Sequence, residues 1–175
     1  MKVVLHICCG VCAAGAAEAL IEEGHQVIGF FYNPNIHPVL EFQRRLGTAY
    51  KVAQKLNFSL EAGPYKSEEW LKMTESLKHE PEGGKRCHVC YRIRLEKAYE
   101  YLTSCGADAF ATTLTISPHK SAQVINKIGQ EVGGKKFLVR DFKKKEGFKR
   151  AVQLAKQWQL YRQDYCGCVY SVRNI

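Results

Sequence analysis

The pattern of apolar and polar positions along the chain predicts strands that alternate with helices. Residues 2–7 (KVVLHI) and 26–32 (QVIGFFY) are short and almost continuously apolar, which is typical of parallel strands buried on both faces. Between them, residues 13–23 form an amphipathic stretch that Gly24 ends, as expected of a helix. This order of strand, helix and strand predicts a parallel pair joined by a crossover helix.

The same alternation continues through the rest of the chain. In chain order we expect a helix from Pro38 to Leu56, a strand at 57–62, a helix at 68–78, a polar loop at 79–85, a helix at 90–104 and a strand at 107–114. Ser117 followed by Pro118 is typical of a further helix start. The sequence therefore predicts a single α/β domain over residues 1–175, with a parallel sheet flanked by helices.

Composition and charge change this picture in one respect. The chain has 175 residues, of which 46% are hydrophobic and 25% charged, as in a folded protein, but its net charge is +9. Residues 135–150 (KKFLVRDFKKKEGFKR) hold eight Lys or Arg with three Phe residues between them. This segment fits a contact with a nucleic-acid backbone, or a solvated basic helix start whose aromatic residues pack in the core.

The N-terminal segment resembles a secretory signal only superficially. His6 and three cysteines interrupt its apolar run, and the strand–helix–strand pattern continues through it. No stretch is long and apolar enough to span a bilayer. We expect a cytoplasmic protein without a membrane partner, in a compartment where free thiols persist.

Cysteines are the main chemical signal in the sequence. Seven of the eight lie in three short groups near the start, middle and end of the chain: Cys8, Cys9 and Cys12; Cys87 and Cys90; Cys166 and Cys168. The C-x-x-C spacing lets two thiolates reach one metal, and Gly167 allows the backbone of the last pair to approach an inorganic core closely. If folding brings the groups together, they form one metal-binding site. Cys105, which stands alone, is expected to be a small buried apolar residue.

Two other interpretations of the cysteines remain open. Eight cysteines could form a disulfide framework, although such frameworks are typical of short secreted domains and this chain is long enough for an ordinary core. A purely structural zinc site is the second alternative, because a C-x-x-C pair occurs in both kinds of site.

Polar residues follow the predicted strands, at the edge where open parallel sheets bind ligands. Candidate binding residues in the loops after the second and the last strand are Asn33, Asn35, His37, Thr113, Thr115, Ser117 and Lys120. The threonines are also explained by ordinary strand propensity, and isolated histidines are often structural.

Five motifs together resemble the QueH family of epoxyqueuosine reductases. They are LHICCGVCA, YNPNIHP, RCHVCYRIRL, TTLTISPHK and YRQDYCGCVYS, in this order and over nearly the whole chain. The resemblance implies an adenine nucleotide alpha hydrolase-like (HUP) α/β fold. It also implies cobalamin-independent reduction of the epoxide of epoxyqueuosine in tRNA of the queuosine family, with a 4Fe-4S cluster and a neighbouring metal ion, expected to be iron, held by the motif cysteines. Relatives that adenylate substrates carry a phosphate-binding loop where this chain has CCGVCA, which argues against ATP use.

The implied reaction needs electrons, a proton and substrate contacts. Candidate proton donors are His119, Asp141, Asp164 and Tyr165. Arg162 and Gln163 are candidates for holding the substrate, and the basic segment 135–150 for holding tRNA phosphates. Asp141 and Asp164 also have arginine neighbours with which they could simply pair. The electrons must come from a donor protein that the motifs do not identify.

A four-ligand cluster would leave three of the seven thiols for a second metal. Successive strand residues point to opposite faces, so we expect one of Cys8 and Cys9 to turn toward the cluster and the other away from it. The expected division gives Cys9, Cys87, Cys90 and Cys168 to the cluster, and Cys8, Cys12 and Cys166 to a metal with an open coordination position. Two rival functions remain: a zinc-stabilised tRNA-binding module, and an ATP-using sulfur-transfer enzyme of the same fold.

Overall fold

The core of the protein is a four-stranded parallel sheet. The computed structural model describes residues 1–171, so the last four residues of the expected domain lie outside the described part. The strand order is β3-β2-β1-β4, with all pairs parallel and Val4 of β1 opposite both Ile28 and Phe110. The strands are β1 (Lys2–His6), β2 (Gln26–Phe31), β3 (Ser59–Ala62) and β4 (Ala109–Thr112). The parallel sheet predicted from the apolar runs is confirmed.

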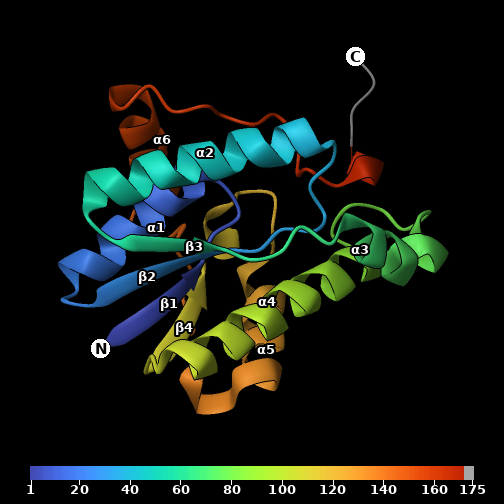
Figure 1. The fold of residues 1–175 in the computed structure, drawn as a ribbon, viewed down its shortest axis with the longest axis horizontal. Helices are drawn as coiled ribbons and strands as arrows, with labels where there is room; N and C mark the ends of the chain where they lie inside the picture. The colour runs from blue at the N-terminus through green and yellow to red at the C-terminus, as the bar shows by residue number, and fades with distance from the viewer. Residues whose placement is uncertain (172–175) are drawn as a thin grey trace.

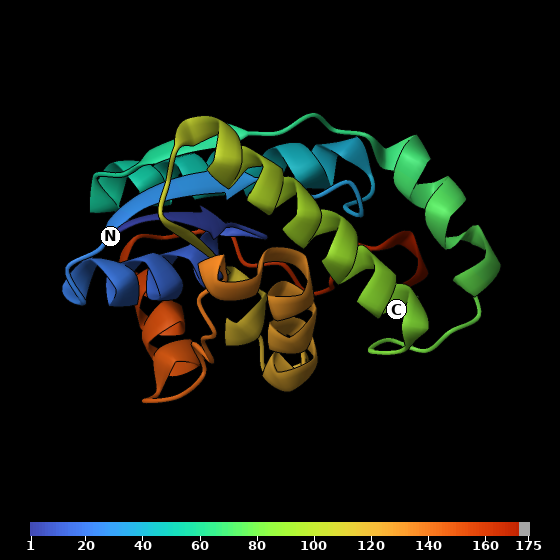
Figure 2. The same ribbon diagram turned by 90° about the horizontal axis from the view of Figure 1, so that it is seen from below.

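Helices cover both faces of this sheet (Figure 1, Figure 2). One face carries α1 (Gly10–Glu22), α2 (Val39–Leu56) and α6 (Gly147–Gln157), and the other carries α4 (Lys85–Cys105) and α5 (Ala122–Gly133). The short α3 (Ser67–Thr74) packs against α4. None of these helices is both long enough and apolar enough to cross a membrane, within the residues that the structure describes.

Each face of the sheet has its own hydrophobic core. Val3 and Leu5 of β1 pack against α1, α2 and α6, whereas the intervening Val4 packs with residues of α4 and α5. Because both faces are covered, every position of β1 from Val3 onward is buried, which explains the continuous apolar run in the sequence.

All four strands end at the same edge, and α1 begins there directly after β1. Gly10 opens this helix against α2, and a Cβ atom built on it would lie 2.3 Å from Thr48 Cγ2. Only glycine permits so close an approach, which brings the first cysteine group beside α2.

Several helix boundaries differ from the sequence prediction. Helix α1 begins at Gly10 rather than residue 13, because the Cys9 sulfur caps it by accepting from the Cys12 amide at 3.4 Å. Helix α4 begins at Lys85, so both cysteines of the C-x-x-C pair lie in its first two turns, whereas the sequence predicted a helix only from residue 90 onward. The predicted start of a helix at Ser117–Pro118 is wrong.

The segment after β4 explains that last error. Strand β4 ends at Thr112 and continues as a 3-10 turn over Thr113–Ile116. The Ser117 hydroxyl accepts the His119 amide and the Ser117 carbonyl accepts the Lys120 amide, which closes a local turn. The Ser121 hydroxyl accepts the Val124 amide at 3.3 Å and caps α5. A serine was the correct type of cap, but the one four residues later is used.

Candidate metal centre and pocket

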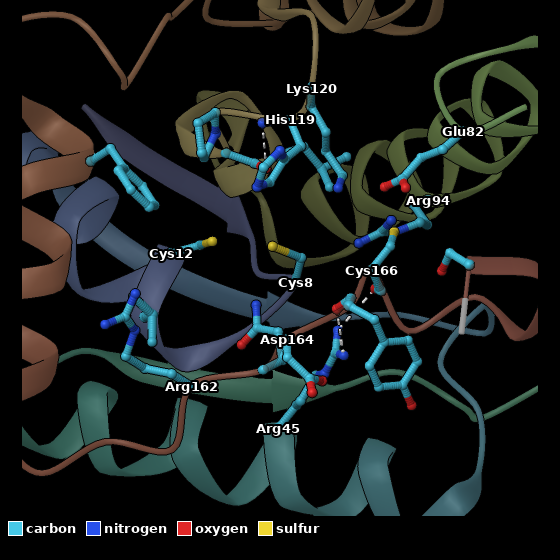
Figure 3. Close-up of a pocket in the computed structure, with 18 residues that line it drawn as sticks. Cys8, Cys12, Arg45, Glu82, Arg94, His119, Lys120, Arg162, Asp164 and Cys166 are labelled. Carbon is cyan, nitrogen blue, oxygen red and sulfur yellow. Dashed lines mark hydrogen bonds between the residues drawn. The ribbon is translucent and has the colours of Figure 1, made fainter. Parts of the chain in front are cut away.

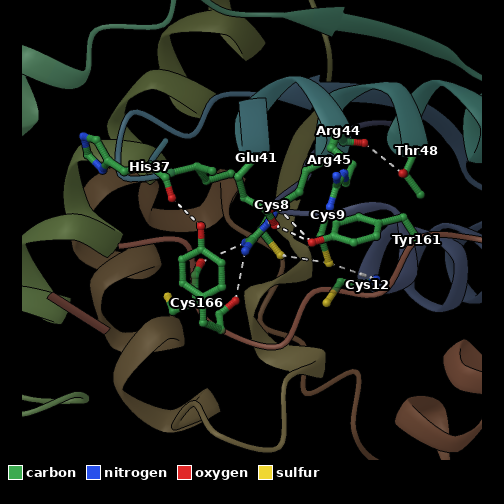
Figure 4. Close-up of polar contacts among 12 residues, drawn as sticks. Cys8, Cys9, Cys12, His37, Glu41, Arg44, Arg45, Thr48, Tyr161 and Cys166 are labelled. Atoms are coloured by element: carbon green, nitrogen blue, oxygen red, sulfur yellow. Dashed lines mark hydrogen bonds and ion pairs between the residues drawn. The ribbon is translucent and has the colours of Figure 1, made fainter. Parts of the chain in front are cut away.

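The first cysteine group is compact. The sulfur atoms of Cys8, Cys9 and Cys12 all lie within 4.8 Å of one another, and those of Cys8 and Cys9 are 3.9 Å apart (Figure 4). The expectation that the Cys8 and Cys9 side chains point to opposite sides is therefore wrong. The strand ends at His6, and Cys9 is already the cap of α1, so strand alternation does not extend to this pair.

Hydrogen bonds and charge make Cys8 the acidic thiol of this group. Hydrogen bonds from the Cys12 and Cys9 thiols, together with the Arg94 charge and the Thr113 hydroxyl, hold the pKa of Cys8 well below its usual range. The same thiol contacts, with burial, raise the pKa of Cys12 well above its usual range. The group thus offers one thiolate and two neighbouring thiols that a metal ion would deprotonate.

The remaining motif cysteines lie outside this compact group. Cys90 and Cys168 are buried together against Trp70, and the sulfur of Cys87 accepts the Gly83 amide at 3.2 Å. Cys166 lines the pocket described below. Among the residues that the structure describes, Cys9 is grouped with Cys8 and Cys12 and not with Cys87, Cys90 and Cys168.

Arg94 lies between the two sets of cysteines. It is 2% exposed, its Nη2 donates to Asn33 Oδ1 at 2.7 Å, and its Nη1 donates to the Cys90 sulfur at 3.9 Å. On the other side its charge lowers the pKa of Cys8. The sequence analysis missed this residue, although its position one helical turn after Cys90 could have indicated it.

A pocket of about 240 Å³ opens at this edge of the sheet (Figure 3). Its sulfur-bearing wall is formed by Cys8, Cys12 and Cys166, and the Cys8 and Cys12 sulfurs point toward one another. Charged residues surround them: Arg45, Glu82, Arg94, Lys120, Arg162 and Asp164. The pocket therefore presents thiols and several cations to a bound molecule.

Besides the three cysteines, seven residues that the sequence singled out line the pocket: Ser117, His119, Lys120, Arg162, Gln163, Asp164 and Tyr165. Lys120 is the best-placed cation among them. Burial lowers its pKa, but the Cys166 sulfur, Tyr91 and the Cys8 sulfur outweigh burial and raise the pKa above its ordinary value. The Tyr165 hydroxyl donates to the carbonyl of His37.

The other candidates lie outside the pocket: Asn33, Asn35, His37, Thr113, Thr115 and Asp141. Asn33 binds Arg94, and the Thr113 hydroxyl accepts the Cys8 amide at 3.1 Å and donates to its sulfur at 3.2 Å. Asp141 accepts the Lys143 amide at 3.1 Å within a turn and does not pair with Arg140. These contacts hold the frame of the site.

The basic segment 135–150 packs two of its three aromatic residues in the core. Phe137 and Phe142 are buried, as one interpretation predicts, whereas Phe148 lines the pocket and the helix begins only at Gly147. Lys143 donates to the carbonyls of Thr115 and Lys120 at 2.9 and 3.2 Å, so it ties two loops together. Lys144 and Lys145 are exposed, and their contact with nucleic acid remains a prediction.

The donor set fits a thiolate-bound iron–sulfur cluster or zinc ion. All eight cysteines are free, and three of their sulfurs already converge. Two buried N–H groups near Cys90, the indole N–H of Trp70 and Nε of Arg94, have no hydrogen-bond partner among the described residues. Sulfur atoms of a bound group would give such donors acceptors.

Comparison with solved structures identifies the fold. The U34-tRNA thiolase NcsA from Methanococcus maripaludis, solved with its [4Fe-4S] cluster, superposes on 99% of this chain with a TM-score of 0.61 and 16% identity. This chain spans 61% of that protein. The two share the HUP-like α/β fold expected from the sequence.

Comparison with known sequences identifies the family. The family model for epoxyqueuosine reductase QueH matches residues 3–174. The epoxyqueuosine reductase QueH of Streptococcus pyogenes serotype M1 is 38% identical over 98% of this chain and 71% of its own length. The Thermotoga maritima QueH is 35% identical over 97% of this chain and 90% of its own length. This chain is therefore a member of the QueH family of epoxyqueuosine reductases, which are oxidoreductases.

Proposed function

We propose that the pocket is the place where the epoxide of epoxyqueuosine in tRNA is reduced to the alkene of queuosine. The observation that carries this proposal is the meeting of Cys8, Cys12 and Cys166 with the cations Lys120 and Arg94 around one cavity. Two electrons and two protons convert the epoxide to an alkene and release its oxygen as water. The thiols can bind a metal group that carries the electrons. The cations can stabilise the negative charge that develops on the epoxide oxygen.

The motif cysteines would hold the redox group. Cys8, Cys9 and Cys12 would form one set, because their sulfurs lie within 4.8 Å of one another. We assign the remaining motif cysteines, Cys87, Cys90, Cys166 and Cys168, to the other set. This geometry favours a division of three and four that differs from the one expected from the sequence. When bound, a 4Fe-4S cluster supplies electrons and a neighbouring metal ion with an open position acts as a Lewis acid.

The chain's own residues would orient the substrate and move protons. His119 and Asp164 line the pocket and are the preferred proton donors, whereas the Tyr165 hydroxyl is engaged with the His37 carbonyl. Lys120 would stabilise the developing oxyanion, and Arg162 and Gln163 would contact the rest of the modified base. Asp141, which lies outside the pocket, is not part of this proposal.

The partner is tRNA. A base must leave the stack to enter a cavity of about 240 Å³, and the exposed Lys144 and Lys145 would hold the backbone nearby. A donor protein must supply the electrons. The free cysteines fit a reducing compartment such as the cytoplasm.

The test is anaerobic reconstitution followed by single turnover. Protein loaded with iron and sulfide, then reduced, is expected to convert epoxyqueuosine in tRNA to queuosine without ATP, as measured by nucleoside chromatography. A zinc-only protein that binds tRNA without turnover would support the tRNA-binding module instead. Strict dependence on ATP would support sulfur transfer.

A further inference from the structure

We propose that Glu41, Arg45 and Tyr161 form a latch, built on the buried charges of Glu41 and Arg45, that holds the C-terminal segment 160–168 against the metal centre before any metal binds. The latch positions Cys166 and Cys168, and Arg45 is its central positioning residue. The inference rests on the proposed function only for the identity of the group that these two cysteines bind.

Arg45 fixes the backbone of this segment directly (Figure 4). It lies on α2, is 2% exposed, and donates from Nη1 to the Cys166 carbonyl at 2.9 Å and from Nη2 to the Tyr165 carbonyl at 3.0 Å. Its Nε donates to Glu41 at 2.7 Å. Its guanidinium also lies over the Tyr165 ring, 5.1 Å from the centroid. One planar side chain thus holds two consecutive carbonyls beside the first cysteine of the pair.

Glu41 ties the beginning of the same segment. Its carboxylate is 8% exposed and accepts the Tyr161 hydroxyl at 3.0 Å on one oxygen and 2.9 Å on the other. Because Glu41 also neutralises Arg45, both buried charges are satisfied within the latch. The segment is therefore held at Tyr161 and again at Tyr165 and Cys166.

The backbone at Gly167, between the two cysteines, packs closely against the His37 loop and Arg45. The His37 amide donates to the Gly167 carbonyl at 2.7 Å. Gly167 has φ +104, and a Cβ atom on it would lie 2.9 Å from Ile36 Cγ1 and 3.0 Å from Arg45 Nη1. Glycine is needed here for its conformation and for the approach of the Arg45 guanidinium.

The segment depends on such side-chain contacts because it has no regular secondary structure of its own. Residues 160–168 belong to neither a helix nor a strand. Ordering them only when a metal binds would cost conformational entropy for each residue, and that cost would weaken the binding. The contacts with α2 remove this entropy cost from metal binding, because they hold the two thiols in place beforehand.

The test is the alkylation rate of each cysteine in metal-free protein, measured by peptide mass spectrometry. Arg45→Lys keeps the charge but cannot reach Glu41 and both carbonyls at once, so Cys166 and Cys168 are expected to react at least about tenfold faster. Cys105, at the far end of α4, should keep its wild-type rate. Lys51→Arg is the matched control, because Lys51 is an exposed residue further along α2 and its replacement should change neither rate.

A second variant keeps the test decisive if Arg45→Lys folds poorly. Tyr161→Phe removes only one hydroxyl, and it should accelerate Cys166 and Cys168 by a smaller factor without a change at Cys105. Unchanged rates at Cys166 and Cys168, or equal acceleration at Cys105, would overturn the latch. Iron content decides a separate question: if the wild type takes up no iron, the proposed cofactor fails, while the alkylation rates still decide the latch.

Discussion

At the scale of single residues, Arg94 connects the two sets of cysteines. A buried guanidinium between thiols stabilises thiolates, because it supplies a positive charge at short range that water screens only weakly. The Asn33 amide holds it in this position through a 2.7 Å hydrogen bond. Burying such a charge costs free energy unless nearby groups interact with it, and the sulfurs of Cys90, Cys8 and Cys166 do so here.

Replacing Arg94 by Met is expected to raise the pKa of Cys8, since the Arg94 charge is one of the causes that lower it. In the wild type the Cys8 thiolate persists through neutral pH, so its alkylation rate should hardly change there. In the variant the pKa of Cys8 is higher, although the hydrogen bonds from Cys12 and Cys9 still lower it, so the loss of Cys8 alkylation on acidification should begin at a higher pH than in the wild type. A pH profile of Cys8 alkylation identical to that of the wild type would contradict the role of Arg94.

Single cysteine replacements test the division of the thiols. Cys87→Ala or Cys90→Ala should abolish the visible absorption of the cluster, because each removes a ligand of the four-cysteine set. Cys12→Ala should keep that absorption but lose most epoxide reduction. Cys9→Ala separates the two divisions: it keeps the cluster if Cys9 belongs with Cys8 and Cys12, and loses it if the division expected from the sequence is right.

At the scale of elements, the segment before α6 has two kinds of lysine. Lys143 donates hydrogen bonds to the carbonyls of Thr115 and Lys120, so it stabilises the loop that carries His119. Lys144 and Lys145 project into solvent. In the sequence the three lysines form one uninterrupted run. Only the fold shows that Lys143 has a structural role, whereas Lys144 and Lys145 are exposed to solvent.

Salt dependence of tRNA binding measures this difference. Each neutralised phosphate contributes a slope of about −0.9 in log K against log salt, so Lys144→Ala with Lys145→Ala should flatten the slope by up to about two units. Lys143→Ala is the control, which should lower thermal stability but leave the slope nearly unchanged. If the double variant has the wild-type slope, these lysines are part of a solvated surface and contact no phosphate.

At the scale of the whole molecule, the sheet separates two hydrophobic cores, one on each of its faces. Leu5 is fully buried in the core formed with α1, α2 and α6, at the centre of β1. Removing the Leu5 side chain would disturb the packing next to Cys8, Cys9 and Cys12, because β1 leads directly into these cysteines. Packing of the sheet is therefore a condition for the geometry of the site.

Leu5→Ala is expected to lower the free energy of unfolding by about 2–5 kcal/mol, because it leaves a cavity in a closed core. Leu40→Ala is the matched control: Leu40 is 70% exposed, and its replacement should change stability by less than about 0.5 kcal/mol. Urea denaturation of the metal-free protein measures both. Equal losses in the two variants would contradict the burial described here.

The order of elements and the kind of site could be read from the sequence. Apolar runs marked β1 and β2 because both faces of a parallel strand are buried, and the spacing of the cysteines indicated a metal centre. Parallel strands must end at one edge, so the sequence also placed the cysteines and the TTLTISPHK loop together there. These inferences depend on local pattern and on simple topology, which the chain carries in order.

The direction of each thiol and the contacts that hold it were decided by the tertiary structure. Cys8 and Cys9 converge because Cys9 caps α1, and Ser121 rather than Ser117 begins α5. Arg45 reaches carbonyls 120 and 121 residues away in the chain. No local pattern encodes such pairs, because the free energy that selects them arises only when distant segments pack and a buried charge must find its partners.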